Sequence, residues 1–197
     1  MIDERLRIRA IGQFLYFYET DLYYINRFQK FKQEASELYL NDSEFSFTAF
    51  LAEFKIIRSI GKQYQRNVLK KVKTWCLSEQ CDDVDGLSDY LFKSKYAHGK
   101  RPLSFSSKVL FLNNPYYVLP LDSRGMNAIG IRNCTYKDYL NGVKEFINSN
   151  KSDLEYCLDV IELMARKVES NFPHLKKIEI IRENRMLDKL LWVIGGQ

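Results

Sequence analysis

Two side chains in the middle of the sequence, Lys108 and Asp122, are of types that could carry out covalent or acid–base chemistry. Both lie in the stretch 101–131, which is otherwise strongly apolar. No acidic residue lies between Asp89 and Asp122. The five charged residues in that interval are all basic, namely Lys93, Lys95, Lys100, Arg101 and Lys108. An isolated carboxylate in such surroundings serves either structure or chemistry, and we weigh both interpretations.

The structural interpretation makes Asp122 a helix N-cap. The residues that follow it, Ser-Arg-Gly-Met-Asn-Ala-Ile, can begin a helix whose first N–H groups donate to the carboxylate. Pro120, two residues earlier, suits an extended approach to a helix start. In the chemical interpretation, the ionised Asp122 stabilises positive charge that develops in a transition state, or it orients a water molecule. A helix N-terminus favours the anion, so the two roles are compatible.

Lys108 also has two interpretations. If burial lowers its pKa, the neutral amine can act as a nucleophile and form a Schiff base. Alternatively, its long side chain keeps the ammonium group in water or against a phosphate. The sequence leaves open whether Lys108 and Asp122 face a common cleft.

The best-defined surface in the sequence is a basic helix face within 62–79. Four basic residues at helical spacing form this face: Lys62, Arg66, Lys70 and Lys73. An apolar set falls on roughly the opposite side: Tyr64, Val68, Val72 and Trp75. From Lys55 to Lys73 there are seven basic residues and no acidic ones, so the helix contains no acid to offset their repulsion. The face is either a solvated surface or one that pairs with acidic residues from elsewhere in the fold. Alternatively, it binds the phosphates of a nucleic acid.

Further phosphate-binding candidates are Lys100 and Arg101, in a basic loop, and Arg124, just after Asp122. The net charge of +5 is a modest excess that suggests nucleic acid where it is concentrated locally.

Several functional classes are disfavoured by composition. The four cysteines form no CxxC pair and no zinc or iron–sulfur spacing, and the two histidines, His98 and His174, are far apart. There is no Walker loop or GxGxxG motif. We therefore expect no metal and no cofactor. The charged N-terminus fits no signal peptide, and no apolar run reaches the ~18 residues of a membrane span, so we expect a cytoplasmic protein that has no membrane partner.

Helical periodicity dominates the chain, and no convincing strand alternation is present. The predicted helices are 3–40, 47–60, 62–79, 87–96, 136–147, 152–170 and 181–194, with a further short helix after Asp122 and a turn at 41–43. Asp21 falls on the apolar face of the first helix, so either this helix breaks near 19–21 or Asp21 is a buried acid; we favour the break. Thr135 is the expected cap of its helix, and Ser152 with Glu155 is an expected capping box.

The predicted fold is all-α and compact, a single domain over 1–197 with two possible packed lobes, 47–130 and 1–46 plus 131–197. At this length the chain needs no disulfide or metal for stability.

Residues 103–129 resemble the core of the helix-hairpin-helix (HhH-GPD) DNA glycosylase superfamily. In this resemblance Leu103-Ser104-Phe105-Ser106-Ser107-Lys108 occupies the place of the hairpin and its lysine, and Leu119-Pro120-Leu121-Asp122 that of the catalytic aspartate. The closing run 185–192 resembles the last helix of a bacterial group related to these enzymes. The resemblance implies the glycosylase fold, Asp122 and Lys108 as catalytic residues, and Ser106 and Ser107 at the DNA-contacting hairpin.

Two functional hypotheses follow. In the first, the protein binds DNA, expected to be double-stranded, and excises a damaged or modified base by cleaving its N-glycosidic bond with Asp122, with Lys108 adding lyase chemistry. Modified foreign DNA, such as that of a phage, is one substrate this hypothesis allows. In the second, the protein is a non-catalytic helical module that binds nucleic acid or a protein. Ser106 and Ser107 stand where the family hairpin usually has glycines, and this favours the second hypothesis. Neither fixes the target base or the oligomeric state.

Overall fold

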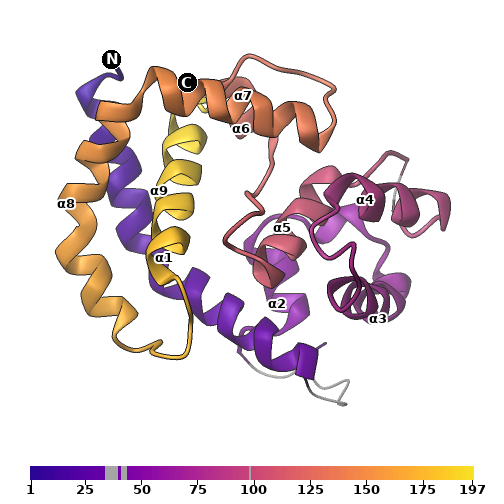
Figure 1. Ribbon diagram of the computed structural model, residues 1–197. Coiled ribbons are helices and arrows are strands. Elements are labelled where there is room, and N and C mark those ends of the chain that lie inside the picture. The colour runs from indigo at the N-terminus through magenta and orange to yellow at the C-terminus, as the bar shows by residue number, and fades with distance from the viewer. Residues whose placement is uncertain (34–39, 41–43, 98) are drawn as a thin grey trace. The chain divides into compact units, whose positions relative to one another are not determined.

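The computed structural model describes residues 1–33, 40, 44–97 and 99–197 (Figure 1). The described part of the chain is helical and contains no strand; an isolated antiparallel β-bridge joins Ile60 and Ala97. The all-α prediction is therefore confirmed. The chain divides into two compact units, unit 1 (1–22 and 121–197) and unit 2 (23–120). These units have their boundaries after residues 22 and 120, whereas the lobes predicted from the sequence have theirs after 46 and 130.

Unit 1 contains the first part of α1 (Glu4–Gln33) and the four helices after residue 120. These are α6 (Ser123–Ala128), α7 (Tyr136–Ser149), α8 (Lys151–Glu169) and α9 (Ile178–Ile194). α9 packs against both α6 and α8, and α7 packs against α8. Ile161 of α8 and the buried leucines of α9, with Phe14 and Tyr18 of α1, contribute to the buried core of the unit.

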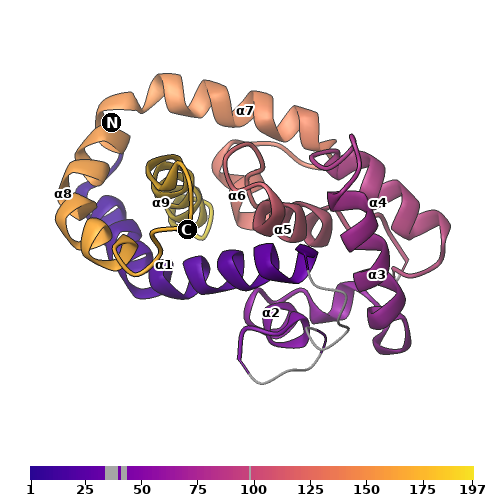
Figure 2. The same cartoon turned by 60° about the horizontal axis from the view of Figure 1, so that its bottom comes forward.

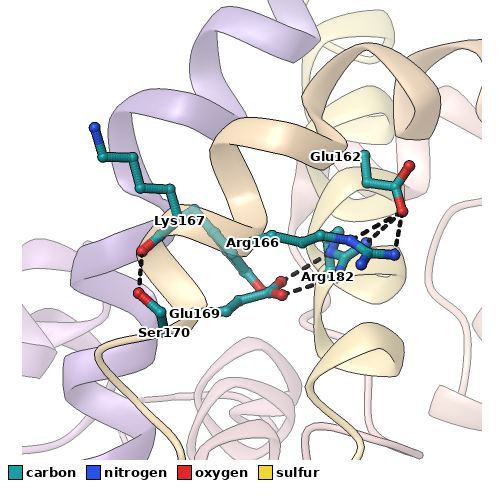
Figure 3. A network of polar contacts seen from close by, with 7 residues as sticks. Glu162, Arg166, Lys167, Glu169, Ser170 and Arg182 are labelled. Carbon is teal, nitrogen blue, oxygen red and sulfur yellow. Dashed lines mark hydrogen bonds and ion pairs between the residues drawn. The ribbon is translucent and has the colours of Figure 1, made fainter.

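Buried polar contacts tie α1, α8 and α9 together. The Tyr18 hydroxyl donates to Glu169 Oε1 at 2.7 Å, and the Arg182 guanidinium forms two bonds of 2.8 Å with the same carboxylate. Figure 3 shows Arg182 of α9 reaching Glu169, and Arg166 pairing with Glu162 on α8. Burial, followed by the bond to Glu169, raises the pKa of Tyr18, so this phenol stays protonated. At the other end of α8, the Ile2 backbone N–H donates to Asp153 Oδ2 at 2.8 Å.

The favoured prediction that the first helix breaks near residue 20 is wrong, because α1 is continuous from Glu4 to Gln33. Asp21 is instead a buried acid, with 3% of its surface exposed. Its Oδ2 accepts bonds from Arg185 Nη2 at 2.6 Å and Nε at 2.8 Å. An acid on an apolar helix face needs no helix break when a distant arginine supplies the charge and the donors.

The helix caps of unit 1 are partly as predicted. Thr135 caps α7 and forms a reciprocal capping box with Asp138. The capping box predicted at Ser152 is wrong, because α8 already begins at Lys151 after Asn150 and shows no side-chain cap. Asp153 points instead into the unit, where it accepts the Ile2 N–H and pairs with Arg7 Nη1 at 3.1 Å.

Unit 2 contains the second part of α1 and the elements up to residue 120. These are α2 (Phe47–Glu53), two 3-10 turns, η2 (Ile57–Ser59) and η3 (Lys62–Tyr64), α3 (Gln65–Cys76), α4 (Val84–Lys93) and α5 (Leu103–Asn113). α5 packs against α3 and α4 and is buried along most of its length. Gln29 of α1 donates to the Leu112 and Asn113 carbonyls, which satisfies the end of α5.

Three predicted helix boundaries in unit 2 are corrected. The helix predicted over 47–60 ends at Glu53, and Lys55 follows with a positive φ of 56°, which an α-helix cannot continue. The helix predicted over 87–96 begins at Val84, because the Asp83 carboxylate accepts from the Gly86 N–H. The helix predicted over 62–79 is α3 alone, with Lys62 in the preceding 3-10 turn. The turn predicted at 41–43, the stretch 34–39 of the first predicted helix and His98 lie outside the described residues.

Candidate functional site

The Asp122 carboxylate caps α6 in unit 1. Its backbone is extended, and its Oδ1 accepts a hydrogen bond from the Gly125 N–H at 2.9 Å. The capping interpretation is therefore confirmed, and the side chain remains half-buried. A β-carbon at Gly125 would lie 2.9 Å from the Tyr139 hydroxyl, so the first turn of α6 lies close against α7. Capping fixes the position of the carboxylate and is compatible with a second, catalytic role. That role stays a prediction.

Around Asp122, unit 1 gathers a cluster of ionisable side chains from α7 and α9. Burial raises the pKa of Tyr139, with further contributions from the charges of Asp188 and Asp122. Burial likewise raises the pKa of Asp188, which the nearby cations partly offset. Burial lowers the pKa of Lys189, and the charge of Arg185 lowers it further, while the acids Asp21, Asp188 and Asp122 oppose this. Burial in this part of the unit thus opposes the charged forms of Asp188 and Lys189, while their contacts with groups of opposite charge support those forms.

Contacts among α1 and α9 hold this cluster. Arg185 Nη1 pairs with Asp188 Oδ2 at 3.0 Å, so the buried guanidinium joins two carboxylates, Asp21 and Asp188. The Lys189 ammonium lies 4.0 Å from Asp21 Oδ2 and 3.9 Å from Asp188 Oδ2, and 4.8 Å from the centre of the Phe17 ring. The result is an amine of lowered pKa in acidic and aromatic surroundings, in the same unit as Asp122.

Sequence reasoning did not identify Asp188 and Lys189 as candidate site residues. The signal available was their spacing, because Arg185, Asp188 and Lys189 lie at i, i+3 and i+4 among the apolar residues of the last helix. Charges at core-facing helical positions require partners, but the sequence does not identify a partner as distant as Asp21.

Lys108 lies in unit 2, on α5, and its ammonium donates to the Phe54 carbonyl oxygen at 3.2 Å. This carbonyl stands at the C-terminal end of α2, where backbone oxygens lack partners within the helix. The half-buried Lys108 therefore has a structural role in joining α5 to α2. Lys108 and Asp122 belong to different units of the chain.

Ser106 and Ser107 are not placed as the resemblance implies. Residues from Leu103 onward form the first turns of α5, and both serine side chains are completely buried. The Ser107 hydroxyl donates to the Ser104 carbonyl at 3.3 Å. Because neither hydroxyl reaches the surface, the interpretation that they contact a DNA phosphate is corrected: these serines are core residues of unit 2.

The predicted basic face is present on α3 and on the turn before it. Val68 and Val72 are fully buried, as the periodicity predicts, while Lys62, Arg66 and Lys70 are exposed. Lys73 is half-buried, with its ammonium 4.9 Å from the centre of the Phe31 ring. The exposed part of the face thus consists of Lys62, Arg66 and Lys70, which we call the basic stripe.

The remaining basic candidates differ in how they are engaged. Arg101 pairs with the α4 residues Asp85 and Asp89, so acids of unit 2 already neutralise its charge. Lys100 is exposed in the preceding loop. Arg124, in unit 1, places its guanidinium carbon 3.8 Å from the centre of the Trp192 ring, a stacking contact between α6 and α9. Arg101 and Arg124 are therefore at least partly structural.

Other features of the described residues add little to the site. A pocket of about 370 Å³ in unit 1 is lined by Asn127, Arg132 and Gln197, among others, at the end of α6 opposite to Asp122. No group of three or more His, Cys, Asp or Glu side chains within the described ranges is arranged to hold a metal. No helix in the described part of the chain combines the length and apolar character that crossing a membrane requires.

Comparison with known proteins adds no relative to this chain. A scan against protein-family models, a search of curated proteins and a search of solved structures each return no match. The resemblance of residues 103–129 to the HhH-GPD glycosylases accordingly stays a prediction carried by the sequence motifs.

Proposed function

We propose that this protein binds double-stranded DNA and hydrolyses the N-glycosidic bond of a damaged or modified base, with Asp122 as the catalytic carboxylate. The observation that carries the proposal is the state of Asp122. Its carboxylate is held by the Gly125 N–H at a helix N-terminus, is half-buried, and interacts electrostatically with Tyr139 of α7 and Asp188 of α9. A fixed anion of this kind stabilises the oxocarbenium-like charge that develops when a base leaves its sugar.

The basic stripe supports the DNA-binding part of the proposal. Lys62, Arg66 and Lys70 are exposed, and unit 2 has no acidic residue from Lys55 to Lys73. Clustered exposed cations of this kind bind phosphates by releasing counterions, which makes affinity depend steeply on salt.

The contact of Lys108 favours hydrolysis over lyase chemistry. The Lys108 amine is engaged in a hydrogen bond to the Phe54 carbonyl within unit 2, whereas Asp122 belongs to unit 1, so the proposal gives Lys108 no role as a nucleophile. We therefore assign the proposed reaction to water activated or oriented near Asp122, without a Schiff base at Lys108.

A second function is favoured by one observation, the burial of Ser106 and Ser107. Without a hairpin that contacts phosphate, the chain can be a helical module that binds nucleic acid and performs no chemistry. In that case Asp122 acts purely as the cap of α6.

Asp122→Asn separates the two functions. Asparagine caps helices about as well as aspartate, so the variant keeps α6 and loses the charge. The proposal predicts that base release from a panel of modified duplexes falls by at least about 100-fold, as expected when a group that stabilises transition-state charge is removed. The thermal midpoint and DNA affinity should stay close to those of the wild type. Release that persists undiminished in the variant would remove Asp122 from the mechanism.

Reversing the charges of the basic stripe tests DNA binding independently of catalysis. The triple variant Lys62→Glu, Arg66→Glu and Lys70→Glu should weaken binding and flatten the dependence of log Kd on log salt by up to about 3 units. The matched control reverses three exposed lysines of unit 1 and so makes the same change in net charge: Lys137, Lys144 and Lys176. Equal losses in both variants would show that net charge, and not the stripe, governs binding.

A further inference from the structure

Helix α8 has a second apolar face that is largely exposed, although the Arg7 guanidinium carbon lies 4.9 Å from the centre of the Tyr156 ring at one end of this face. Its buried face, which includes Cys157, Ile161 and Ala165, packs into unit 1. Four other large apolar side chains of the same helix are exposed: Tyr156 by 45%, Val160 by 48%, Leu163 by 80% and Met164 by 57%. Figure 2 shows α8 beside α1 and α9, which both lie on its buried side.

The spacing of these exposed residues is that of a helix-pairing seam. Tyr156, Val160 and Leu163 follow one another at i, i+4 and i+7, and Met164 borders them. This alternation of four and three residues is the a/d pattern of a coiled coil, in which each side chain fits between residues of a facing helix. We call Tyr156, Val160, Leu163 and Met164 the α8 seam. A leucine with 80% exposure gains most from a partner, because the stabilisation grows with the apolar area removed from water.

Charges beside the seam indicate what kind of partner fits. Asp159 and Arg166 lie seven residues apart and therefore at the same position of successive heptads, and both are exposed. The acids Glu155 and Asp159 precede the middle of the seam, while Arg166 and Lys167 follow it. Within the helix, Lys151 pairs with Glu155 and Glu162 pairs with Arg166. An acid before the middle of the seam, such as Asp159, and a base after it, such as Arg166, still face each other when two copies run antiparallel.

We propose that the protein forms a homodimer in which the α8 seams of two copies pair antiparallel about a two-fold axis. Val160 packs against Leu163 of the second copy, and Asp159 faces Arg166 of the second copy, with each contact made twice. The Arg166 guanidinium has five donors, so it can keep its bond to Glu162 on its own helix while meeting the second copy. This inference concerns assembly and does not depend on the proposed glycosylase activity.

A single helix pair makes a small interface, so the expected dimer is weak and in concentration-dependent equilibrium with monomer. The first experiment is sedimentation velocity of the full chain over a two-decade concentration series starting at low micromolar. Leu163→Glu should abolish the shift toward dimer. Leu77→Glu is the matched control, because Leu77 is an exposed leucine of unit 2, at 65% exposure, and lies far from α8 in the sequence. A wild type that stays monomeric throughout, or equal effects of the two substitutions, overturns the proposal.

The second experiment tests the antiparallel register. Asp159→Arg alone places like charges opposite each other twice, and so does Arg166→Asp alone, so each variant should dimerise more weakly than the wild type. In a mixed dimer of the two variants both pairs are attractive, because the arginine introduced in one chain meets the aspartate introduced in the other, and the second pair keeps its native residues. Recovery of dimer in the equimolar mixture supports the proposed pairing.

If the acids and bases of α8 serve only its own macrodipole, the mixture behaves as the average of its components, which refutes the pairing. Far-UV circular dichroism of each variant checks that the fold is retained.

Discussion

The buried ion pair between Asp21 and Arg185 gives a sharp prediction about stability. The Arg185 side chain is 2% exposed and that of Asp21 is 4% exposed, and two hydrogen bonds of 2.6 and 2.8 Å join them. Removing one partner of a buried pair leaves the other charge without full compensation, which typically costs about 3–5 kcal/mol, roughly a third or more of a domain's stability. Asp188 still accepts a bond from Arg185 at 3.0 Å, so we expect Asp21→Asn to lie near the lower end, at about 3 kcal/mol.

The measurement is urea unfolding followed by far-UV circular dichroism, with the slope compared between variants to check that the transition is unchanged. Glu19→Gln is the matched control, because Glu19 is exposed on the same helix and its neutralisation should change stability by less than about 0.5 kcal/mol. If Asp21→Asn lowers the free energy of unfolding by less than about 1 kcal/mol, the reasoning is refuted, because Arg185 would not then depend on Asp21 for compensation of its buried charge.

Replacing both partners tests the same reasoning from the other side. The double variant Asp21→Leu with Arg185→Met removes both charges and fills the space with apolar groups, which in buried pairs is often close to neutral. Asp188 then loses its nearer cation and keeps Lys189 at 3.9 Å, and since burial already raises the pKa of Asp188, it can take up a proton in response. We expect the double variant to lose less stability than Asp21→Asn alone. A loss equal to the sum of the two single replacements would show that the residues act independently.

Two further predictions concern packing and thiols. At Gly195 a β-carbon would lie 1.8 Å from the Arg124 carbonyl oxygen, so Gly195→Ala should destabilise the protein by about 1–3 kcal/mol in urea unfolding. Gly12 lies within α1 with no atom within 4 Å of such a carbon, so Gly12→Ala should stabilise by about 0.5–1 kcal/mol; the same sign for both substitutions would contradict this account. Burial raises the pKa of Cys76 to about 12 and that of Cys157 to about 11, so at mildly alkaline pH about one thiol in a thousand or fewer is ionised. Neither should react with a disulfide reagent until urea unfolds the chain, and rapid labelling of either in the native protein would contradict their burial.

Local sequence signals predicted the helices and several of their caps. Asp122 and Thr135 were identifiable as caps because the groups they bond, the N–H groups of Gly125 and Asp138, lie three residues away. Val68 and Val72 were identifiable as buried because they repeat at the helical period. These features depend on neighbours within one or two turns of helix.

The errors share a different cause. The break expected near Asp21, the capping box expected at Ser152 and the surface role expected for Ser106 each followed from a side chain's usual local behaviour. In each case tertiary packing changed the outcome: Asp21 meets Arg185, Asp153 meets the N-terminal backbone, and α5 carries Ser106 into the core. A polar residue at a core-facing position is compatible with the fold when a distant partner satisfies it.

For the candidate site, the sequence by itself determined that Asp122 begins a helix and that basic residues recur along one helix face. Tertiary structure alone decided that Asp188 and Lys189 gather near Asp122, that Lys108 donates to Phe54, and that Arg101 is neutralised by acids of α4. The physical reason is the separation along the sequence over which each kind of interaction acts. Helix propensity and capping act over a few residues, whereas burial and ion pairing join side chains such as Asp21 and Arg185 that are 164 positions apart.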